Sequence, residues 1–506
     1  MRGQSLRGGI FWSLLTFVAA KSITFLSTLV LARLLGPSEF GVMAAVLAYV
    51  ALLELIGDLG MNATVVYESE KGITPRVETA FTLNLIVAAV LTVAGVLLAP
   101  FIADFFNVGS HADLFRLAAL DLILTGLGNV HDAILLRELD FCRRIVPQLA
   151  ANIVRAGLTI ALVALGLGAL GLVVGFLAGT AAGTIALWAL SSFRPRLTIQ
   201  RSALRSMLTY GGWASVLQIF AVIGNRADVA VIGRVLGERA LGIYVIGQRL
   251  PELVIENVSW NLSVVAFPAL SRKRDSEQGM VPTTLNLVRY GALFGLPVGA
   301  LISVLATPLV VVLFGAKWQA AGVVMSAVAL MYAMNAVIFP LGDVFKALGR
   351  QPTMVAYNAA LVPTMVAAMV LASPSGIGAV VWARVGVSFV SGAVLVVLVL
   401  RALDLRLVTF LVQLRGAVAA GAGVVAGSGA VRLLWPDNSV GPLVTGALAG
   451  AAVGLLALRL FGRHEYGELT EVIGRRLRSR APLTSPPEPV TATVPTTEPP
   501  HERLAP

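Results

Sequence analysis

The stretch LARLLGPSEFG, from Leu31 to Gly41, joins two apolar segments and returns later in the chain. Its second copy, IGRVLGERALG, runs from Ile232 to Gly242, an offset of 201 residues. The shared positions keep their spacing in both copies and are Arg33, Gly36 and Gly41 in the first, and Arg234, Gly237 and Gly242 in the second. A chain that repeats one corner in this way is predicted to contain two similar halves.

The composition identifies an integral membrane protein. Of the 506 residues, 57% are hydrophobic and only 13% are charged, which excludes a set of soluble domains. The basic residues behind the net charge of +11 lie between apolar segments and form no single face, so nucleic acid is not an expected partner. One cysteine and four scattered histidines provide no metal-ligand spacing, so we expect neither a metal site nor a cofactor.

Apolar runs near the length that spans a bilayer recur from Ile10 to Phe461. Such segments must be helical, because only a helix satisfies its own backbone groups in lipid. The sequence therefore predicts an all-α integral membrane protein with about 14 transmembrane helices. The predicted ranges are 10–32, 40–63, 80–103, 114–134, 146–165, 169–192, 209–233, 240–263, 287–314, 320–341, 354–372, 377–400, 411–434 and 440–461.

Lys and Arg fall mainly in alternate loops, which places both termini in the cytoplasm. The two copies of the corner then have the same orientation, as in a parallel repeat about an axis along the membrane normal. We expect an N-terminal six-helix lobe (1–200), a C-terminal six-helix lobe (201–402) and two further helices (403–461), followed by a cytoplasmic tail (462–506). The end of this tail is basic and then rich in Pro and Thr, which predicts disorder.

The corner itself is expected to be a tight hairpin on the outside. Gly36 is predicted to adopt the left-handed conformation that ends a helix. Pro37 and Glu39 suit the first turn of the following helix. Two lobes of this kind are the plan of a transporter that binds its cargo between them, although duplication kept only for packing is the alternative.

Four cations lie within predicted spans, where a charge is costly and usually faces a cavity or a partner. On different helices, they could converge on one anion, and we expect them to bind substrate; they are Lys21, Arg155, Arg226 and Arg249. The alternative is neutralisation by nearby carboxylates, Arg249 by Glu252 and Arg226 by Asp228.

Intramembrane acids are candidates either for charge balance or for coupling to H⁺ or Na⁺. Glu54 and Asp58 form an i,i+4 pair on one helix, and Asp228, Glu252 and Glu256 lie near the predicted cations. Sequence does not separate the two roles. Ser and Thr on the same stripes are interpreted as interhelical hydrogen-bonding groups.

Several segments together resemble one transporter family. They are LARLLGPSEFGVMAAV, ELIGDLGMNATVV, NRADVAVIGRVLGERALGIYVIGQRL and VAFPALSRKR. In combination they are similar to the Wzx-type polysaccharide or O-antigen flippases of the multidrug/oligosaccharidyl-lipid/polysaccharide flippase superfamily. Arg33, Gly36 and Gly41 and their second copies carry the family motif, and we interpret them as structural.

The resemblance implies a bacterial inner-membrane protein with a V-shaped pair of lobes around a cationic cavity. It implies translocation of undecaprenyl-pyrophosphate-linked oligosaccharides by alternating access, for O-antigen, capsule or exopolysaccharide synthesis. Partners would be the lipid-linked oligosaccharide, membrane lipids, a polysaccharide polymerase and a chain-length regulator.

Other functions remain open from sequence alone. A lipid II flippase or a multidrug antiporter would belong to the same superfamily. A membrane polysaccharide polymerase or glycosyltransferase would need a large outer loop or an acidic metal motif outside, and the predicted outer connections are short. The sequence therefore predicts a transporter and not an enzyme.

Overall fold

The computed structural model describes residues 6–57, 73–137, 141–273, 279–463, 465–467 and 471. Within these ranges every regular element is helical. Ten segments are long and apolar enough to cross a membrane, and one of them, Gln351–Ala402, holds two successive helices. The protein is thus an all-helical, multi-pass membrane protein with about fourteen helices.

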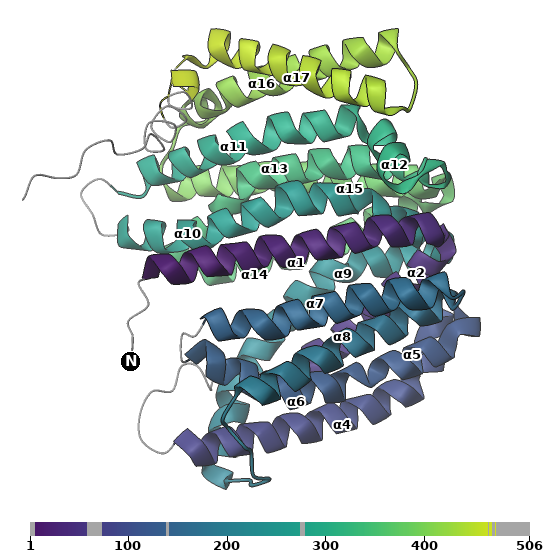
Figure 1. Cartoon of the computed structure of the whole chain (residues 1–506). Coiled ribbons are helices and arrows are strands. Elements are labelled where there is room, and N and C mark those ends of the chain that lie inside the picture. The colour runs from purple at the N-terminus through teal and green to yellow at the C-terminus, as the bar shows by residue number, and fades with distance from the viewer. Residues whose placement is uncertain are drawn as a thin grey trace, which may run out of the picture.

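A first bundle contains the helices up to Leu190 (Figure 1). They are α1 (Leu6–Leu34), α2 (Pro37–Gly57), α4 (Ile73–Phe105), α5 (Ala112–Ala119), α6 (Asp121–Arg137), α7 (Phe141–Ala164) and α8 (Gly168–Leu190). Helix α7 packs on both α1 and α8, and α4 packs on α5 and α6. Gly175 and Gly179 of α8 allow the close approach of α7, because a Cβ at either position would collide with Thr159 or Arg155.

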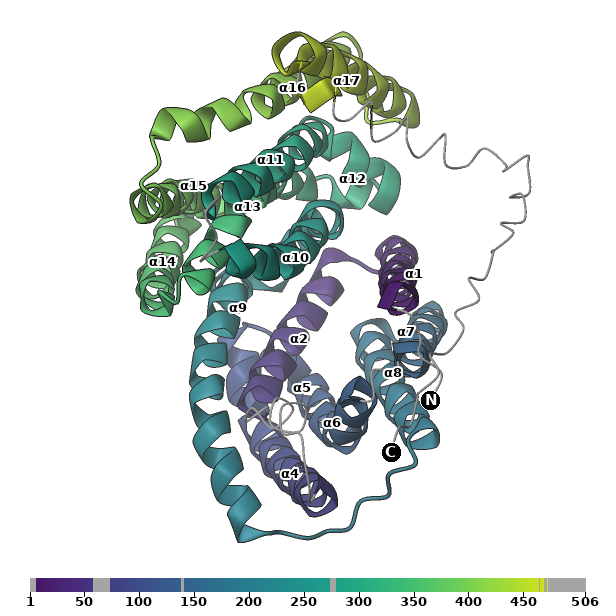
Figure 2. The same cartoon turned by 90° about the vertical axis from the view of Figure 1, so that its left-hand side faces the viewer.

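A second bundle follows, and Figure 2 shows α9 running along the first bundle before it joins the second. Its elements are α9 (Arg201–Pro251), the π-helical turn η2 (Glu252–Glu256), α10 (Asn257–Lys273), α11 (Val281–Val304), α12 (Ala306–Phe314), α13 (Ala321–Ala347), α14 (Gln351–Ala372) and α15 (Gly376–Ala402). Helix α13 is apolar on every side and contacts α9, α10, α11 and α15, so it forms the centre of this bundle.

The last two helices, α16 (Leu407–Leu434) and α17 (Val440–Phe461), form a pair beside α11 (Figure 2). Glycines let their backbones approach closely, as is common between membrane helices. A Cβ at Gly423 would lie 2.7 Å from the Val453 carbonyl oxygen, and one at Gly427 would lie 2.6 Å from that of Ala449.

Within the described residues the fourteen predicted ranges fall largely on helix, with differences at three of them; residues 58–63 of the second range lie outside the described part of the chain. The fourth divides into α5 and α6, and the ninth divides into α11 and α12 at Leu305. The eighth covers the end of α9, the π-helical turn and much of α10. Pro251 is the last residue of α9 and the helical path continues into the π-helical turn, whereas Pro268 lies inside α10.

The two corners are built differently at their glycines. Gly237 has φ 80° and ψ 179° and breaks α9 where a turn was predicted. Gly36 has no positive φ, so the expected left-handed conformation is wrong for the first copy. Its N–H instead donates to Glu39 Oε2 at 2.6 Å, and Pro37 begins α2 as predicted. Glu39, the third residue of α2, thus accepts from the N–H of the residue that precedes the helix, as the glutamate of a capping box does.

The second glycine of each corner brings the two copies together. A Cβ at Gly41 would overlap the carbonyl oxygen of Glu238, and a Cβ at Gly242 would overlap that of Pro37. Each corner therefore presents a glycine to the backbone of the other. This mutual contact lies where α2 and α9 pack on each other, and it explains why both copies keep the same small residue.

The arginine of each corner also donates hydrogen bonds to a helix of the other bundle. Arg33 donates from Nη2 to the Val312 carbonyl at 2.8 Å, in the last turn of α12. Arg234 donates from Nη1 to the carbonyls of Asp104 and Phe105 at 3.4 Å, in the last turn of α4. A guanidinium suits the free carbonyls and negative dipole end of a helix. These contacts agree with a structural role for the motif.

A residue that follows each of these two helices, α12 and α4, donates a hydrogen bond to the backbone carbonyl of the corner arginine. Lys317 donates from Nζ to the carbonyl of Arg33 at 3.0 Å, and Asn107 donates from Nδ2 to the carbonyl of Arg234 at 2.6 Å. Trp318 adds a hydrogen bond of 2.8 Å to Ala32. The two corners are thus joined to the opposite bundle through matching sets of bonds.

We predict that Gly41→Ala and Gly242→Ala each lower the thermal unfolding midpoint of the purified protein. The added methyl group overlaps a carbonyl, and overpacking of this kind costs about 1–3 kcal/mol. Gly157→Ala, in α7, is the matched control, because a Cβ there meets nothing within 4 Å. Equal midpoints for all three variants would contradict the reciprocal packing of the corners.

Candidate functional site

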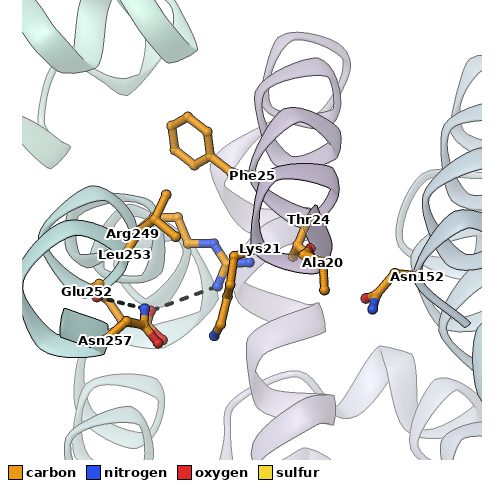
Figure 3. Close-up of a pocket in the computed structure, with 9 residues that line it drawn as sticks. All are labelled: Ala20, Lys21, Thr24, Phe25, Asn152, Arg249, Glu252, Leu253 and Asn257. Carbon is orange, nitrogen blue, oxygen red and sulfur yellow. Dashed lines mark hydrogen bonds and ion pairs between the residues drawn. The ribbon is translucent and has the colours of Figure 1, made fainter. Parts of the chain in front are cut away.

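A pocket of about 200 Å³ lies between the two bundles and is lined mostly by polar side chains (Figure 3). Lys21 and Thr24 of α1 and Asn152 of α7 line it from the first bundle. Arg249 at the end of α9 and Glu252 of the π-helical turn line it from the second. In Figure 3 Arg249 extends from the teal helix of the second bundle and Lys21 from the purple helix of the first.

A second pocket of about 180 Å³ adjoins the first and shares Thr24, Asn152 and Arg249 with it. Arg155 of α7 lines this second pocket, together with apolar side chains from α2 and α8. Three of the four predicted cations, from three helices, thus line these two adjoining pockets.

The fourth predicted cation, Arg226, lines neither of these two pockets. Its side chain is exposed, and it interacts electrostatically with Glu54 of α2. The alternative pairing of Arg226 with Asp228 is wrong, because Asp228 is paired with another arginine, as described below.

Arg155 lies between the second pocket and a group of polar side chains in the first bundle. Its Nη2 is 3.5 Å from Thr180 Oγ1, and its guanidinium carbon is 4.7 Å from the centroid of the Phe176 ring. It also interacts electrostatically with Glu54 and Asp121. Its buried Nε has no hydrogen-bond partner among the described residues.

Carboxylates of the π-helical turn adjoin the first pocket. Glu252 lies 3.8 Å from Arg249, so the predicted neutralisation of Arg249 is present in part. Glu256, one turn further, hydrogen-bonds Tyr332 of α13 and interacts electrostatically with Lys21. π-helical turns are rare and frequently occur at functional sites. This turn brings two acids toward the cations of the first pocket without burying either cation completely.

Asp228 forms a buried ion pair inside the second bundle. Its Oδ2 is 2.7 Å from Arg384 Nη1 of α15, and its exposed fraction is 3%. Tyr244 Oη donates to the same carboxylate and accepts from Arg384. A carboxylate with this environment already has its counter-charge, which argues against a role in ion coupling. Asp58, the remaining candidate acid, lies outside the described residues.

Arg384, Tyr244 and Tyr332 are not among the site residues predicted from the sequence. A signal for Arg384 was present, because it is the only charged residue between Gly376 and Leu400, and a lone intramembrane charge implies a partner. The tyrosines had no such signal, since aromatic residues are common in apolar helices.

We predict that Arg384→Met lowers the thermal unfolding midpoint strongly, because removing one partner of a buried pair costs about 3–5 kcal/mol. The double variant Asp228→Leu, Arg384→Met should recover much of the loss, since no lone charge is left buried. Arg116→Met is the control: its partner Asp113 is exposed, and such pairs contribute about 0–1 kcal/mol. Equal effects at Arg384 and Arg116 would show that the pair is not buried.

Comparison with known proteins places this chain in a family. Residues 30–323, more than half of the chain, match the family described as polysaccharide biosynthesis protein. The matched region includes both corners. It also includes every residue that lines the two pockets except those of α1 that precede residue 30.

Two curated bacterial proteins are similar over two thirds of the chain. The succinoglycan biosynthesis transport protein ExoT of Rhizobium meliloti is 26% identical over 338 residues, which cover 65% of this chain and 67% of ExoT. The lipopolysaccharide biosynthesis protein WzxC of Escherichia coli is 22% identical over 354 residues, which cover 69% of this chain and 71% of WzxC.

Solved structures agree on the fold. The lipid II flippase MurJ, in an inward closed conformation, superposes with a TM-score of 0.74 at 14% identity, covering 91% of this chain and all of that one. An inward-facing multidrug transporter of the MATE family has a TM-score of 0.58 at 19% identity and covers 76% of this chain and 94% of its own. The resemblance predicted from sequence is thus confirmed: the chain belongs to the polysaccharide biosynthesis protein family, a family of membrane transporters with the MOP superfamily fold.

Proposed function

We propose that this protein translocates undecaprenyl-pyrophosphate-linked oligosaccharides across the bacterial inner membrane. The units would leave the cytoplasmic leaflet and reach the periplasmic leaflet, where they supply O-antigen, capsule or exopolysaccharide synthesis. The observation that carries the proposal is the convergence of Lys21, Arg155 and Arg249 on one space between the bundles. Family membership supports it, as do relatives named for succinoglycan transport and lipopolysaccharide biosynthesis.

The charged headgroup explains why such a site is needed. A pyrophosphate in hydrocarbon loses its hydration at a cost of many kcal/mol, unless charged hydrogen-bond donors replace the water. Two arginines offer planar, bidentate donors and a lysine offers a compact charge, which together suit the oxygens of a pyrophosphate. The prenyl tail requires no such help and remains in lipid.

The size of the first pocket indicates how cargo would enter. Its volume of about 200 Å³ equals the liquid volume of about six or seven water molecules, so this pocket accommodates a headgroup and not an oligosaccharide. Because its walls belong to different bundles, the bundles must separate to admit the sugars. Alternating access then means that this separation occurs first toward the cytoplasm and later toward the periplasm.

In this proposal residues 1–200 and 201–402 act as two lobes around a V-shaped cavity, with both termini in the cytoplasm. Helices α16 and α17 are additions to the second lobe, and residues 462–506 form the tail. The repeat offset of 201 residues and the reciprocal corners support the two-lobe arrangement. A polysaccharide polymerase and a chain-length regulator would use the delivered units.

We predict that Lys21→Gln, Arg155→Gln and Arg249→Gln together abolish surface polysaccharide and cause lipid-linked intermediate to accumulate. Hydrogen bonds to charged groups contribute about 1.5–3 kcal/mol each, so every arginine removed should weaken binding roughly 10- to 150-fold. The measurement is surface polymer and lipid-linked intermediate in a deletion strain that carries the variant gene at normal protein level.

Arg401→Gln, an exposed arginine outside both pockets, is the matched control and should restore polymer. Adding Arg226→Gln to the triple variant tests whether the fourth cation contributes. Normal polymer from this quadruple variant would refute the proposed function.

A further inference from the structure

The end of α17 has two faces of opposite character. One face packs on α16 and is made of the buried residues Gly454, Leu458 and Gly462. The other, which we call the basic face, lines a third pocket of about 530 Å³. Its residues recur at intervals of three or four and so share one side of a helix. They are Leu456, Arg459, Leu460, Arg463 and Tyr466.

The two arginines of the basic face have no partner within the described part of the chain. Arg459 and Arg463 are exposed and one turn apart, so their Cβ atoms lie about 5–6 Å from each other. Neither guanidinium forms an ion pair or hydrogen bond with another described residue. Two positive charges are therefore available on one side of the helix.

The acid nearest in sequence lies on the opposite face. Glu465 has an exposed fraction of 6% and packs against α16, where a Cβ at Gly416 would lie 3.3 Å from its carboxyl carbon. Its carboxylate is thus directed away from the basic face. The helix separates its acid from its arginines, so this face attracts an anion from outside the protein.

Apolar side chains adjoin the arginines on the side of the membrane. Leu456 and Leu460 are both 55% exposed and lie within the candidate span Val440–Phe461. Arg459 is in the last turn of that span, and Arg463 follows it. Figure 2 shows the pair of α16 and α17 at one edge of the molecule. The basic face therefore meets lipid, with acyl chains beside the leucines and headgroups beside the arginines.

We propose that the basic face binds one anionic phospholipid, with the phosphate between Arg459 and Arg463 and an acyl chain along Leu456 and Leu460. Guanidinium groups suit phosphate oxygens, and basic clusters at the end of a membrane helix attract anionic lipids. A zwitterionic lipid fits less well, because its ammonium group is repelled by the same two charges. This inference goes beyond the proposed function and does not depend on it.

The test is native mass spectrometry of the purified full-length protein in detergent, with phosphatidylglycerol and phosphatidylcholine added in competition. An arginine at this level strengthens the attraction of an anionic lipid about fivefold. Arg459→Gln and Arg463→Gln together should therefore lower the affinity for phosphatidylglycerol about 30-fold and leave that for phosphatidylcholine unchanged. An unchanged affinity for phosphatidylglycerol would overturn the site.

The matched control removes the same charge elsewhere on the protein. Arg401 and Arg406 are exposed, lie just before α16 and do not line the pocket. Arg401→Gln, Arg406→Gln should keep the affinity of the wild-type protein for phosphatidylglycerol. An equal loss in both double variants would show that only the net charge matters, which overturns the site.

Two competitors distinguish other sources of phosphate. Inorganic phosphate lacks an acyl chain, so its displacement of phosphatidylglycerol at equal concentration would overturn the assignment to a lipid. Farnesyl pyrophosphate represents the transported class. If it bound this face more tightly than phosphatidylglycerol, the face would belong to the cargo and the proposal would fail.

A second measurement covers the case in which the double variant folds poorly. Arg463→Gln alone lies beyond the span and should lower the affinity about fivefold. A ligand that binds the folded state raises the thermal unfolding midpoint. Phosphatidylglycerol should raise the midpoint of the wild-type protein and the control more than that of Arg463→Gln. Equal increases in all three would overturn the proposal.

Discussion

The structure depends on one constraint: a charged side chain inside the bilayer must have either an oppositely charged partner or a water-filled cavity. Both solutions occur side by side. Asp228 and Arg384 neutralise each other inside the second bundle, where Tyr244 completes their hydrogen bonding. Lys21, Arg155 and Arg249 instead line a space between the bundles, and each has acids nearby. Because buried pairs are neutral and rigid, the cations that remain accessible are the ones that can exchange partners with a cargo.

The position of the site between bundles has an energetic meaning. In the proposed function, a ligand held by Lys21 and Arg155 on one side and Arg249 on the other would be bound only when both sides are at the right distance. Its binding energy would then depend on the relative position of the bundles, so it would shift the population toward conformations that bring the three cations together. A site built within a single bundle would bind equally well in every arrangement and would exert no such effect.

The helices and the three pocket cations were predictable because both follow local rules. A span is read from a run of apolar residues, and a polar face is read from residues at intervals of three or four. The pairing of Arg226 with Asp228 failed by the same rule. Residues two positions apart on a helix point to different sides, so Arg226 is exposed whereas Asp228 turns toward α15. The partner of Asp228 lies far away in the sequence, and no local pattern links the two positions. The conformation of Gly36 also escaped prediction, because a side chain three residues away replaced the expected turn.

The reciprocal corners restrict how this chain can be recombined. Gly41 fits against the backbone at Glu238, and Gly242 fits against that at Pro37, while Arg33 and Arg234 each end a helix of the other bundle. Each corner packs against the backbone of the other, so a change in the backbone path of one requires a matching change in the other. A hybrid that joins the first half of one relative to the second half of another inherits mismatched corners unless both parents share the same backbone path there. Exchange of whole halves between relatives is therefore limited by a few residues at the two corners, however similar the membrane-spanning helices are.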